Sequence, residues 1–430
     1  MGLELVERIR RMTQQDVRNG ILISIAALFA LVLTVLFVLF YSKIFTWCDA
    51  FAKSTAANRE WLHLLLAPIC FFAGAGLCWK FAPEAVGNGV SKIRTALSKI
   101  ERGDDNVEPQ LGPRLIVTKA IASWICSLGG GALGREGPVV HLSAALFWLF
   151  GRHIKKWFPR MDLRHWIVGG SAIGFAVAFN TPLAGLIFAV EELSDDNLAR
   201  GKLMTLWLVL LACVFQGFLM PVIPLFHFEL YFAPWQEMLG EILITCVICG
   251  VLSALLKMTS EKAQQHVQAR YPFWIVALVC GMAVGLIGVW AGGQSFGGGV
   301  ITIQQAMRSA EPVIHFKECI ARIANTLLSA FSGNAGGLLG PSVALGASIG
   351  SVVGDLVGMV DVRILMTCGM AAFLGGFMSM PLTAAILAFE TTGQGPLILA
   401  FFLSGMMGHL TAAMTNYLFK KNTDINGKAE

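Results

Sequence analysis

Long apolar stretches separated by short polar segments dominate the chain. Ile21 to Tyr41 supplies 21 residues without a charge, about the length that a membrane-spanning helix needs. It is too long for a signal-peptide core and no small-residue cleavage site follows it, so we expect it to be retained. Further apolar stretches run near residues 62–79, 115–133, 138–151, 166–190, 203–226, 238–256, 273–291, 319–331, 338–360, 364–390 and 396–419. The pattern predicts an all-α polytopic membrane protein.

Several of these stretches are too short for a simple crossing or are interrupted by Gly and Pro, and the chain contains 46 Gly. Inside a bilayer, an interrupted helix is tolerated only where its backbone is buried in protein or lines a cavity. Broken helices of this kind form the binding sites of many transporters. The interruptions therefore indicate a permeation site within the membrane.

Composition excludes an ordinary soluble enzyme. Charged residues make up 14% of the chain and hydrophobic residues 56%, whereas soluble domains carry about 25% charge. Much of the net charge of +5 comes from the two ends and forms no single patch, so nucleic-acid binding is not indicated. Basic residues flank the first and last apolar stretches, and by the positive-inside tendency we expect both termini in the cytoplasm. These residues are Arg8, Arg10, Arg11, Arg18, Lys420, Lys421 and Lys428.

The two halves of the chain share one plan: a Gly-rich turn, then an X-Pro-Leu sequence, then a Glu nine residues after the proline. These elements are Gly134–Pro138, Thr181–Leu183 and Glu191 in the first half, and Gly337–Pro341, Met380–Leu382 and Glu390 in the second. Upstream, Gly87–Val90 corresponds to Gly297–Val300. Sites in repeated transporters lie between the halves near the midplane, and the repeats are inverted or parallel. We expect a cytoplasmic segment over 1–20, membrane repeats over 21–230 and 231–420, a short cytoplasmic tail over 421–430, and no regulatory domain.

Two acidic residues differ between the halves. Leu338 and Leu339 stand where the first half has Arg135 and Glu136, so packing at this turn does not require charge. Glu191 matches Glu390, whereas its neighbour Glu192 matches a threonine. An ionised side chain at membrane depth costs roughly 2.5 to 3.5 kcal/mol or more, so an unshared carboxylate there is a candidate site residue. We interpret Glu136 and Glu192 as functional and the shared pair as structural.

Three Gly-rich turns predict an anion site. A turn that opens a helix leaves backbone N–H groups free at the positive end of the helix dipole, which binds an anion without a full positive charge. If the turns converge, they replace the hydration shell of a small monovalent anion and still allow its release. The candidate anion-binding residues are Gly87, Asn88, Gly89, Val90, Arg135, Gly137, Gly337, Leu338, Leu339 and Gly340.

Glu136 connects the anion site to protons. Its carboxylate is itself an anion that can compete for the turns, and on protonation it loses that attraction and moves aside. Glu192, 56 residues later, could carry protons between this gate and the cytoplasm, because buried carboxylates can hold a proton near neutral pH. Arg135 either orients the gate or has a structural role at the helix end.

These motifs resemble the CLC family of anion channels and anion/proton antiporters over about residues 60 to 415. Phe81–Ile93 resembles the first anion-binding motif of the family, Gly134–Pro138 is identical to its GREGP motif, Ala178–Gly185 matches the stretch before the proton-handling glutamate, and Gly337–Pro341 resembles its third motif. The resemblance implies an inverted repeat of tilted and broken helices, and a homodimer with one pathway per subunit. It also implies an external gating glutamate at Glu136 and the internal proton-transfer glutamate of antiporters at Glu192. We expect the inner membrane of a bacterium.

The chain departs from the family pattern at several positions. Chloride-selective members have Ser where Asn88 stands and Pro where Ser91 stands, and the third motif has Leu339 for Phe and Gly340 for Ala. The family's late anion-contacting Tyr has no matching stretch; Tyr417 is the only late candidate and fits an interfacial aromatic better. Loss of the Ser and the Tyr is similar to the fluoride-exporting branch, whereas Glu192 and an intact GREGP favour chloride. We favour chloride/proton exchange, with fluoride/proton exchange as the alternative.

Two further alternatives are a passive anion channel, which only flux measurements separate from exchange, and an intramembrane enzyme. His141, Ser143 and Ser171 lie in apolar stretches, but no nucleophile elbow or paired metal ligands accompany them. For His141 we favour packing over a place on the pathway. We expect no enzymatic activity, no cofactor and no metal ion, and chloride or fluoride, protons and the lipid bilayer as partners.

Overall fold

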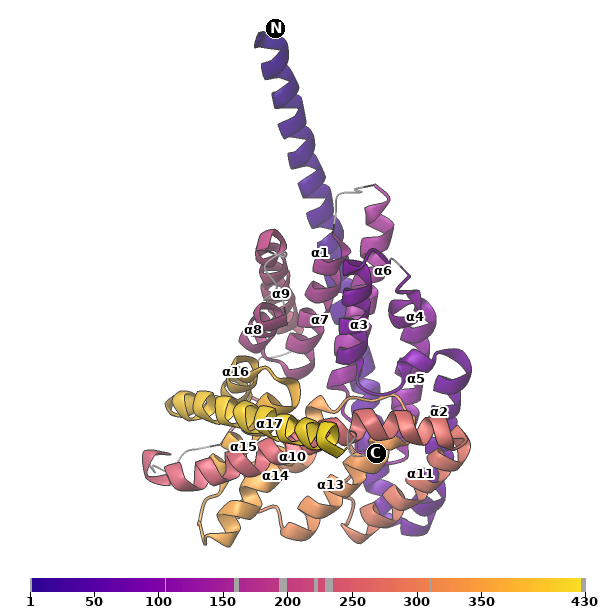
Figure 1. Ribbon diagram of the computed structural model, residues 1–430, viewed down its shortest axis with the longest axis vertical. Helices are drawn as coiled ribbons and strands as arrows, with labels where there is room; N and C mark the ends of the chain where they lie inside the picture. Colours follow the sequence, from indigo (N-terminus) through magenta and orange to yellow (C-terminus); the bar gives the residue numbers. More distant parts are fainter. Residues whose placement is uncertain are drawn as a thin grey trace.

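The computed structural model is a bundle of helices of very different lengths (Figure 1). It describes residues 2–104, 106–157, 162–192, 199–219, 223–228, 235–309 and 311–426; within helices, the side chains of residues 2–20, 192, 199–205, 261–269 and 422–426 are not described. In the described part, six helices are long and apolar enough to cross a membrane. One of them is the long helix α1 (Gly2–Asn58), whose N-terminal end projects from the body in Figure 1.

After α1, two series of helices follow in a similar order. The first is α2 (Glu60–Phe81), η1 (Pro83–Ala85), α3 (Gly89–Glu101), α4 (Glu108–Leu111), α5 (Pro113–Leu128), α6 (Glu136–Lys155), α7 (Leu163–Phe179), α8 (Pro182–Glu192) and α9 (Ala199–Leu219). The second is η3 (Trp235–Met238), α10 (Leu239–Arg270), α11 (Phe273–Trp290), α12 (Val300–Arg308), α13 (Phe316–Phe331), α14 (Leu339–Leu356), α15 (Arg363–Met378), α16 (Pro381–Thr392), η4 (Gly395–Leu397) and α17 (Ile398–Asn426).

Corresponding helices of the two series pack against each other. Helix α2 packs on α11, α8 packs on α16, and α6 contacts α14. In Figure 1, α6 to α9 lie in the upper part and α10, α13, α14 and α17 in the lower part. Pairing of corresponding helices is what a twofold relation between two halves produces.

Two of the long apolar stretches are interrupted at matching places. The stretch 166–190 breaks at Asn180 (φ 57°) between α7 and α8, and the stretch 364–390 breaks at Ser379 (φ 62°) between α15 and α16. An X-Pro pair follows each break, and a residue before proline is disfavoured in helical geometry. The left-handed residue ends one helix, and a new short helix starts at the following proline in each half, as expected for stretches interrupted by Pro.

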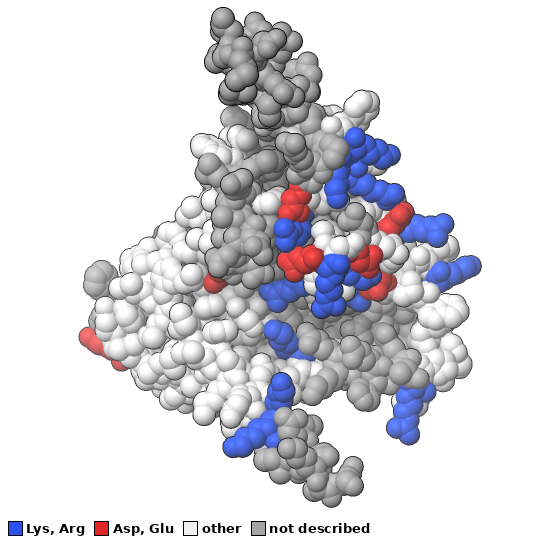
Figure 2. Space-filling view, turned by 45° about the horizontal axis from the view of Figure 1, so that its top comes forward, with Lys and Arg blue, Asp and Glu red and all other residues white. Residues whose placement is uncertain are grey.

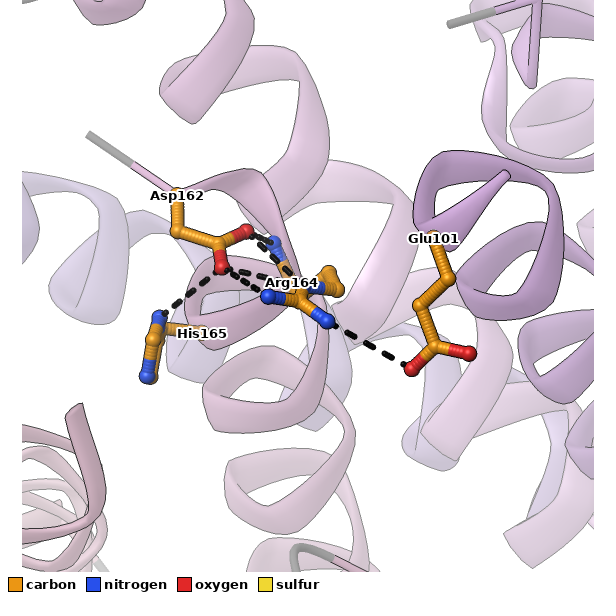
Figure 3. Close-up of polar contacts among 4 residues, drawn as sticks. All are labelled: Glu101, Asp162, Arg164 and His165. Carbon is orange, nitrogen blue, oxygen red and sulfur yellow. Dashed lines mark hydrogen bonds and ion pairs between the residues drawn. The ribbon is translucent and has the colours of Figure 1, made fainter. Parts of the chain in front are cut away.

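Charged side chains are concentrated at one part of the face in Figure 2, beside broad uncharged areas. Asp162 caps α7 by accepting a hydrogen bond from the Arg164 backbone N–H at 2.9 Å, and Arg164 Nη1 lies 3.5 Å from Glu101 Oε1 (Figure 3). Burial alone would raise the pKa of Asp162, but the hydrogen bonds from Arg164 outweigh it and hold the pKa below its usual value. This contact joins the end of α3 to the start of α7.

Candidate functional site

The three Gly-rich turns meet at one place, which we call the three-turn site (Gly87–Val90, Gly134–Pro138 and Gly337–Pro341). The Gly134 N–H donates to the Gly337 carbonyl at 2.8 Å, and the Gly337 N–H donates back to the Gly134 carbonyl at 3.0 Å. The Gly87 N–H donates to the Asn334 carbonyl at 3.0 Å, close before the third turn. The starts of α3, α6 and α14 therefore converge.

Close packing at the centre of the site requires glycine. A Cβ on Gly137 would lie 2.5 Å from the Gly337 Cα, and a Cβ on Gly337 would lie 2.5 Å from the Gly137 Cα. The same Cβ on Gly137 would lie 3.2 Å from the Asn88 Oδ1. Larger residues at these two positions would force the turns apart, since side-chain carbon atoms do not approach backbone this closely.

Glu136 lies at the meeting point of α6 and α14. It begins α6, is 2% exposed, and places its carboxyl group against Gly134 and Gly340, where a side chain on either glycine would collide with it. Its Oε2 atom has no hydrogen-bond partner among the described residues. The carboxylate thus lies at the first turn of two helices, where unpaired N–H groups and the helix dipoles favour negative charge.

Arg135 and the two leucines show how the turns differ. The Arg135 Nε atom lies 3.7 Å from Glu136 Oε1, and its Nη1 donates to Thr46 Oγ1 on α1 at 3.0 Å. Leu338 and Leu339, at the matching positions, are 5% and 1% exposed. The third turn is therefore packed by apolar side chains, whereas the second carries an ion pair at the same place.

Asn88 is the N-cap residue of α3. Its Oδ1 accepts a hydrogen bond from the Val90 N–H at 3.4 Å, so one backbone donor of the first turn already has a partner within the chain. Because Asn88 also lies against Gly137, its side chain is part of the three-turn site and controls how many N–H groups the first turn offers.

Three other candidates lie elsewhere. His141 on α6 is fully buried, its Nε2 is 2.8 Å from the Gln110 carbonyl, and its ring packs against Gly89, where no Cβ would fit. His141 thus supports the first turn by packing against Gly89.

Tyr417 is 66% exposed on α17, which packs mainly on α10, α15 and α16, so it is not part of the three-turn site. Glu192 ends α8, and its side chain lies outside the described residues.

Two buried cations were missed by the sequence reasoning. Lys119 on α5 is fully buried, and its Nζ donates to the Ala85 and Gly87 carbonyls, each at 2.9 Å. Arg322 on α13 is 2% exposed and donates to the Gln294 carbonyl and, at 3.2 Å, to Thr302 Oγ1. Each holds the Gly-rich segment that precedes α3 or α12. A comparison of the two halves of the sequence could have paired these two cations. Lys119 stands 15 residues before Gly134, and Arg322 stands 15 residues before Gly337.

A cavity of about 230 Å³ leads to Glu136. Its walls come from α1, from the turn before α6 and from the first residues of α12, and its lining includes Phe45, Thr46, Arg135, Glu136, Gly298 and Gln304. The gate candidate therefore combines a buried carboxyl group, a cavity beside it and three converging helix starts.

Comparison with known proteins identifies the family. The family model described as voltage gated chloride channel matches residues 69–413. The chain is 29% identical over 436 residues to the H+/Cl− exchange transporter ClcA of Salmonella agona, covering 94% of this chain and 88% of the relative. It is 28% identical over 364 residues to ClcA of Vibrio parahaemolyticus, covering 80% and 75%. The chain belongs to this family of CLC proteins.

Solved structures show the same fold. A slow cyanobacterial Cl−/H+ antiporter superposes with a TM-score of 0.76 at 18% identity, covering 93% of this chain and 97% of the other. A CLC-type fluoride/proton antiporter superposes with a TM-score of 0.74 at 21% identity, covering 90% and 94%. The protein is therefore a multi-pass integral membrane protein with the CLC inverted repeat of tilted and broken helices, as the resemblance to the family implied.

Proposed function

We propose that the protein is a secondary antiporter that exchanges chloride for protons, with Glu136 as the gate. The observation that carries the proposal is the position of the Glu136 carboxyl group, which is buried against Gly134 and Gly340 at the starts of α6 and α14 and has an Oε2 atom without a hydrogen-bond partner among the described residues. The names of the relatives, H+/Cl− exchange transporter and Cl−/H+ antiporter, support the choice of ions.

The exchange follows from competition for one place. The ionised Glu136 carboxylate occupies the positive ends of two helices, so an anion can enter only when that carboxylate leaves. Protonation removes the charge that holds the side chain there, and it moves toward the cavity at its side. Entry of one anion is thereby tied to binding of a proton. Glu192, at the end of α8, is the group that we propose delivers protons from the cytoplasm.

Fluoride/proton exchange is the second candidate. Asn88 stands where chloride-selective members of the family have Ser, and its side chain already engages the Val90 N–H. A solved neighbour with this fold is described as a fluoride/proton antiporter. A passive channel is the third candidate and differs from both because protons do not move with the anion. We also propose a homodimer with one pathway per subunit, located in a bacterial inner membrane with both termini in the cytoplasm.

Flux measurements on purified protein test the proposal. Liposomes containing the protein are loaded in turn with chloride, fluoride or nitrate, placed in a solution of low anion concentration, and the external pH is recorded. We expect chloride efflux to drive protons into the liposomes without any initial pH gradient. Anion efflux without proton movement would identify a channel, and coupled movement with fluoride alone would identify a fluoride antiporter.

A further inference from the structure

A second carboxyl group lines the same cavity as Glu136. Asp49 lies on α1, before the residues that match the family model. It is 6% exposed, and its Oδ2 atom is 3.8 Å from the Lys53 Nζ one helical turn later. Its Oδ1 atom has no hydrogen-bond partner in the described part of the chain. A buried carboxylate that is only partly satisfied is costly and calls for a reason.

The turn Gly297–Gly299, which precedes α12, packs between the side chains of Asp49 and Arg322. A Cβ on Gly297 (φ 65°) would collide with the Asp49 carboxyl group, and a Cβ on Gly299 (φ 83°) would lie 2.6 Å from Arg322 Nη1. Both glycines adopt left-handed geometry that other residues avoid. Gly298, between them, lines the cavity. Asp49 therefore lines the cavity beside Gly297–Val300, the second-half counterpart of the first anion-binding turn.

The charges around Asp49 come from three helices. Lys53 lies on α1, Arg322 on α13, and Arg135 and Glu136 at the start of α6; the Cys48 thiol is the remaining titratable neighbour. With both carboxyl groups ionised, three cations and two anions leave one net positive charge. The Lys53 Nζ and Arg322 Nη1 atoms have no hydrogen-bond partner among the residues that the structure describes. Asp49 and Glu136 are thus the two groups that offset the positive charge around the cavity.

We propose that Asp49 is a positioning residue that sets the electrostatic balance of the Glu136 cavity and thereby the anion affinity and pH dependence of exchange. This inference rests on the proposed function. The Asp49 carboxylate repels an anion in the cavity and favours the protonated form of Glu136 over the ionised form. It therefore weakens anion binding and keeps the gate able to open at higher pH.

The test uses Asp49→Asn in proteoliposomes, with the anion concentration and external pH varied separately. We expect the half-saturating chloride concentration to fall about fivefold, the effect of one unit charge several ångströms away in a medium between protein and water. We expect the pH of half-maximal flux to move to lower pH. Glu60→Gln, which removes an exposed acidic residue at the start of α2, is the matched control and should leave both values unchanged.

A charge-balanced pair of variants separates net charge from other roles. Lys53→Gln alone should raise the half-saturating chloride concentration and move the pH of half-maximal flux to higher pH. Asp49→Asn combined with Lys53→Gln should return both quantities toward wild type. If the double variant behaves like Asp49→Asn alone, Asp49 acts by another route and the inference is wrong; an unchanged Asp49→Asn contradicts it directly. If wild type moves anions without protons, the proposed antiport fails, while the chloride affinities still decide the role of Asp49.

Discussion

Glu191 and Glu390 each cap the helix that carries the other. The Glu191 carboxylate at the end of α8 accepts hydrogen bonds from the Leu382 N–H at 3.1 Å and the Thr383 N–H at 2.9 Å in the first turn of α16, and also from the Thr383 hydroxyl. Glu390 on α16 accepts from the Leu183 and Ala184 N–H groups of α8, at 2.9 and 2.7 Å. This reciprocal capping supports the interpretation of Glu191 and Glu390 as structural residues.

The first prediction concerns the stability of this pair. Glu390→Gln removes the charge from two hydrogen bonds to backbone N–H groups, and hydrogen bonds to charged groups contribute about 1.5 to 3 kcal/mol each. We expect a loss of about 2 kcal/mol of unfolding free energy, with proton coupling retained in the folded protein. Thermal unfolding in detergent and proteoliposome flux measure the two quantities. Lost coupling at normal stability would assign Glu390 to proton transport.

The second prediction concerns the gate. Replacing Glu136 with Ala removes the competing carboxylate, so we expect proton movement to disappear while chloride flux continues. The flux should also lose its dependence on external pH, since the titrating group is gone. Recording pH and chloride together in proteoliposomes provides both values, with Glu84→Gln, a partly exposed carboxylate paired with Lys92, as the control. Intact proton coupling in Glu136→Ala would reject the gate assignment.

The third prediction concerns Glu192, whose neighbour Glu191 provides a matched comparison. Because Gln has nearly the same shape and cannot carry a proton, Glu192→Gln should lose proton coupling and retain chloride flux. Glu191→Gln should lower thermal stability and retain coupling. The same flux assay compares the two variants side by side. Wild-type pH responses in Glu192→Gln would leave it with a structural role.

The fourth prediction concerns anion selectivity. Asn88→Ser shortens the side chain that engages the Val90 N–H and lies against Gly137, so it changes both the donors and the space that an anion meets. We expect the ratio of chloride to fluoride flux to change, with proton coupling kept. Competition between the two halides in proteoliposomes measures the ratio. His141→Gln, which changes a residue packed against Gly89, is the control for a general distortion of the first turn. An unchanged ratio in Asn88→Ser would remove Asn88 from the site.

The fifth prediction concerns pH and the cap of α7. The Asp162 pKa is lower in the folded protein than its usual value of about 3.9, so Asp162 stabilises the fold above pH 4 and this contribution is lost as the pH falls through its lowered pKa. Asp162→Ala should therefore lower the melting temperature at pH 7 and lower it less at pH 3, where the pH is already below the usual pKa of the carboxyl group and part of the contribution is lost. Parallel melting curves at the two values test this. An equal loss at both would show that the ionised form is unimportant.

The sequence identified the three Gly-rich turns because each motif is local and has a counterpart in the other half, whereas their convergence comes from the structure, through the backbone hydrogen bonds between Gly134 and Gly337. Gly134 and Gly337 could be matched by comparing the halves. Because Leu339 stands where the first half has Glu136, the comparison also indicated that packing of the turn does not require Glu136. Lys119 and Arg322 could have been found by the same comparison but differ in residue type. Asp49 could not, because α1 lies outside the matched motifs and its contact with the turn before α12 joins residues about 250 positions apart.

The paired backbone hydrogen bonds between Gly134 and Gly337 limit how this protein can move. Pulling the two halves apart there would leave two N–H and two carbonyl groups without partners in an apolar interior, at a cost of several kcal/mol. Large rocking of one half against the other is thus a poor route for carrying ions across. We expect the scaffold to stay still during turnover, with displacement confined to a few side chains and the ions themselves.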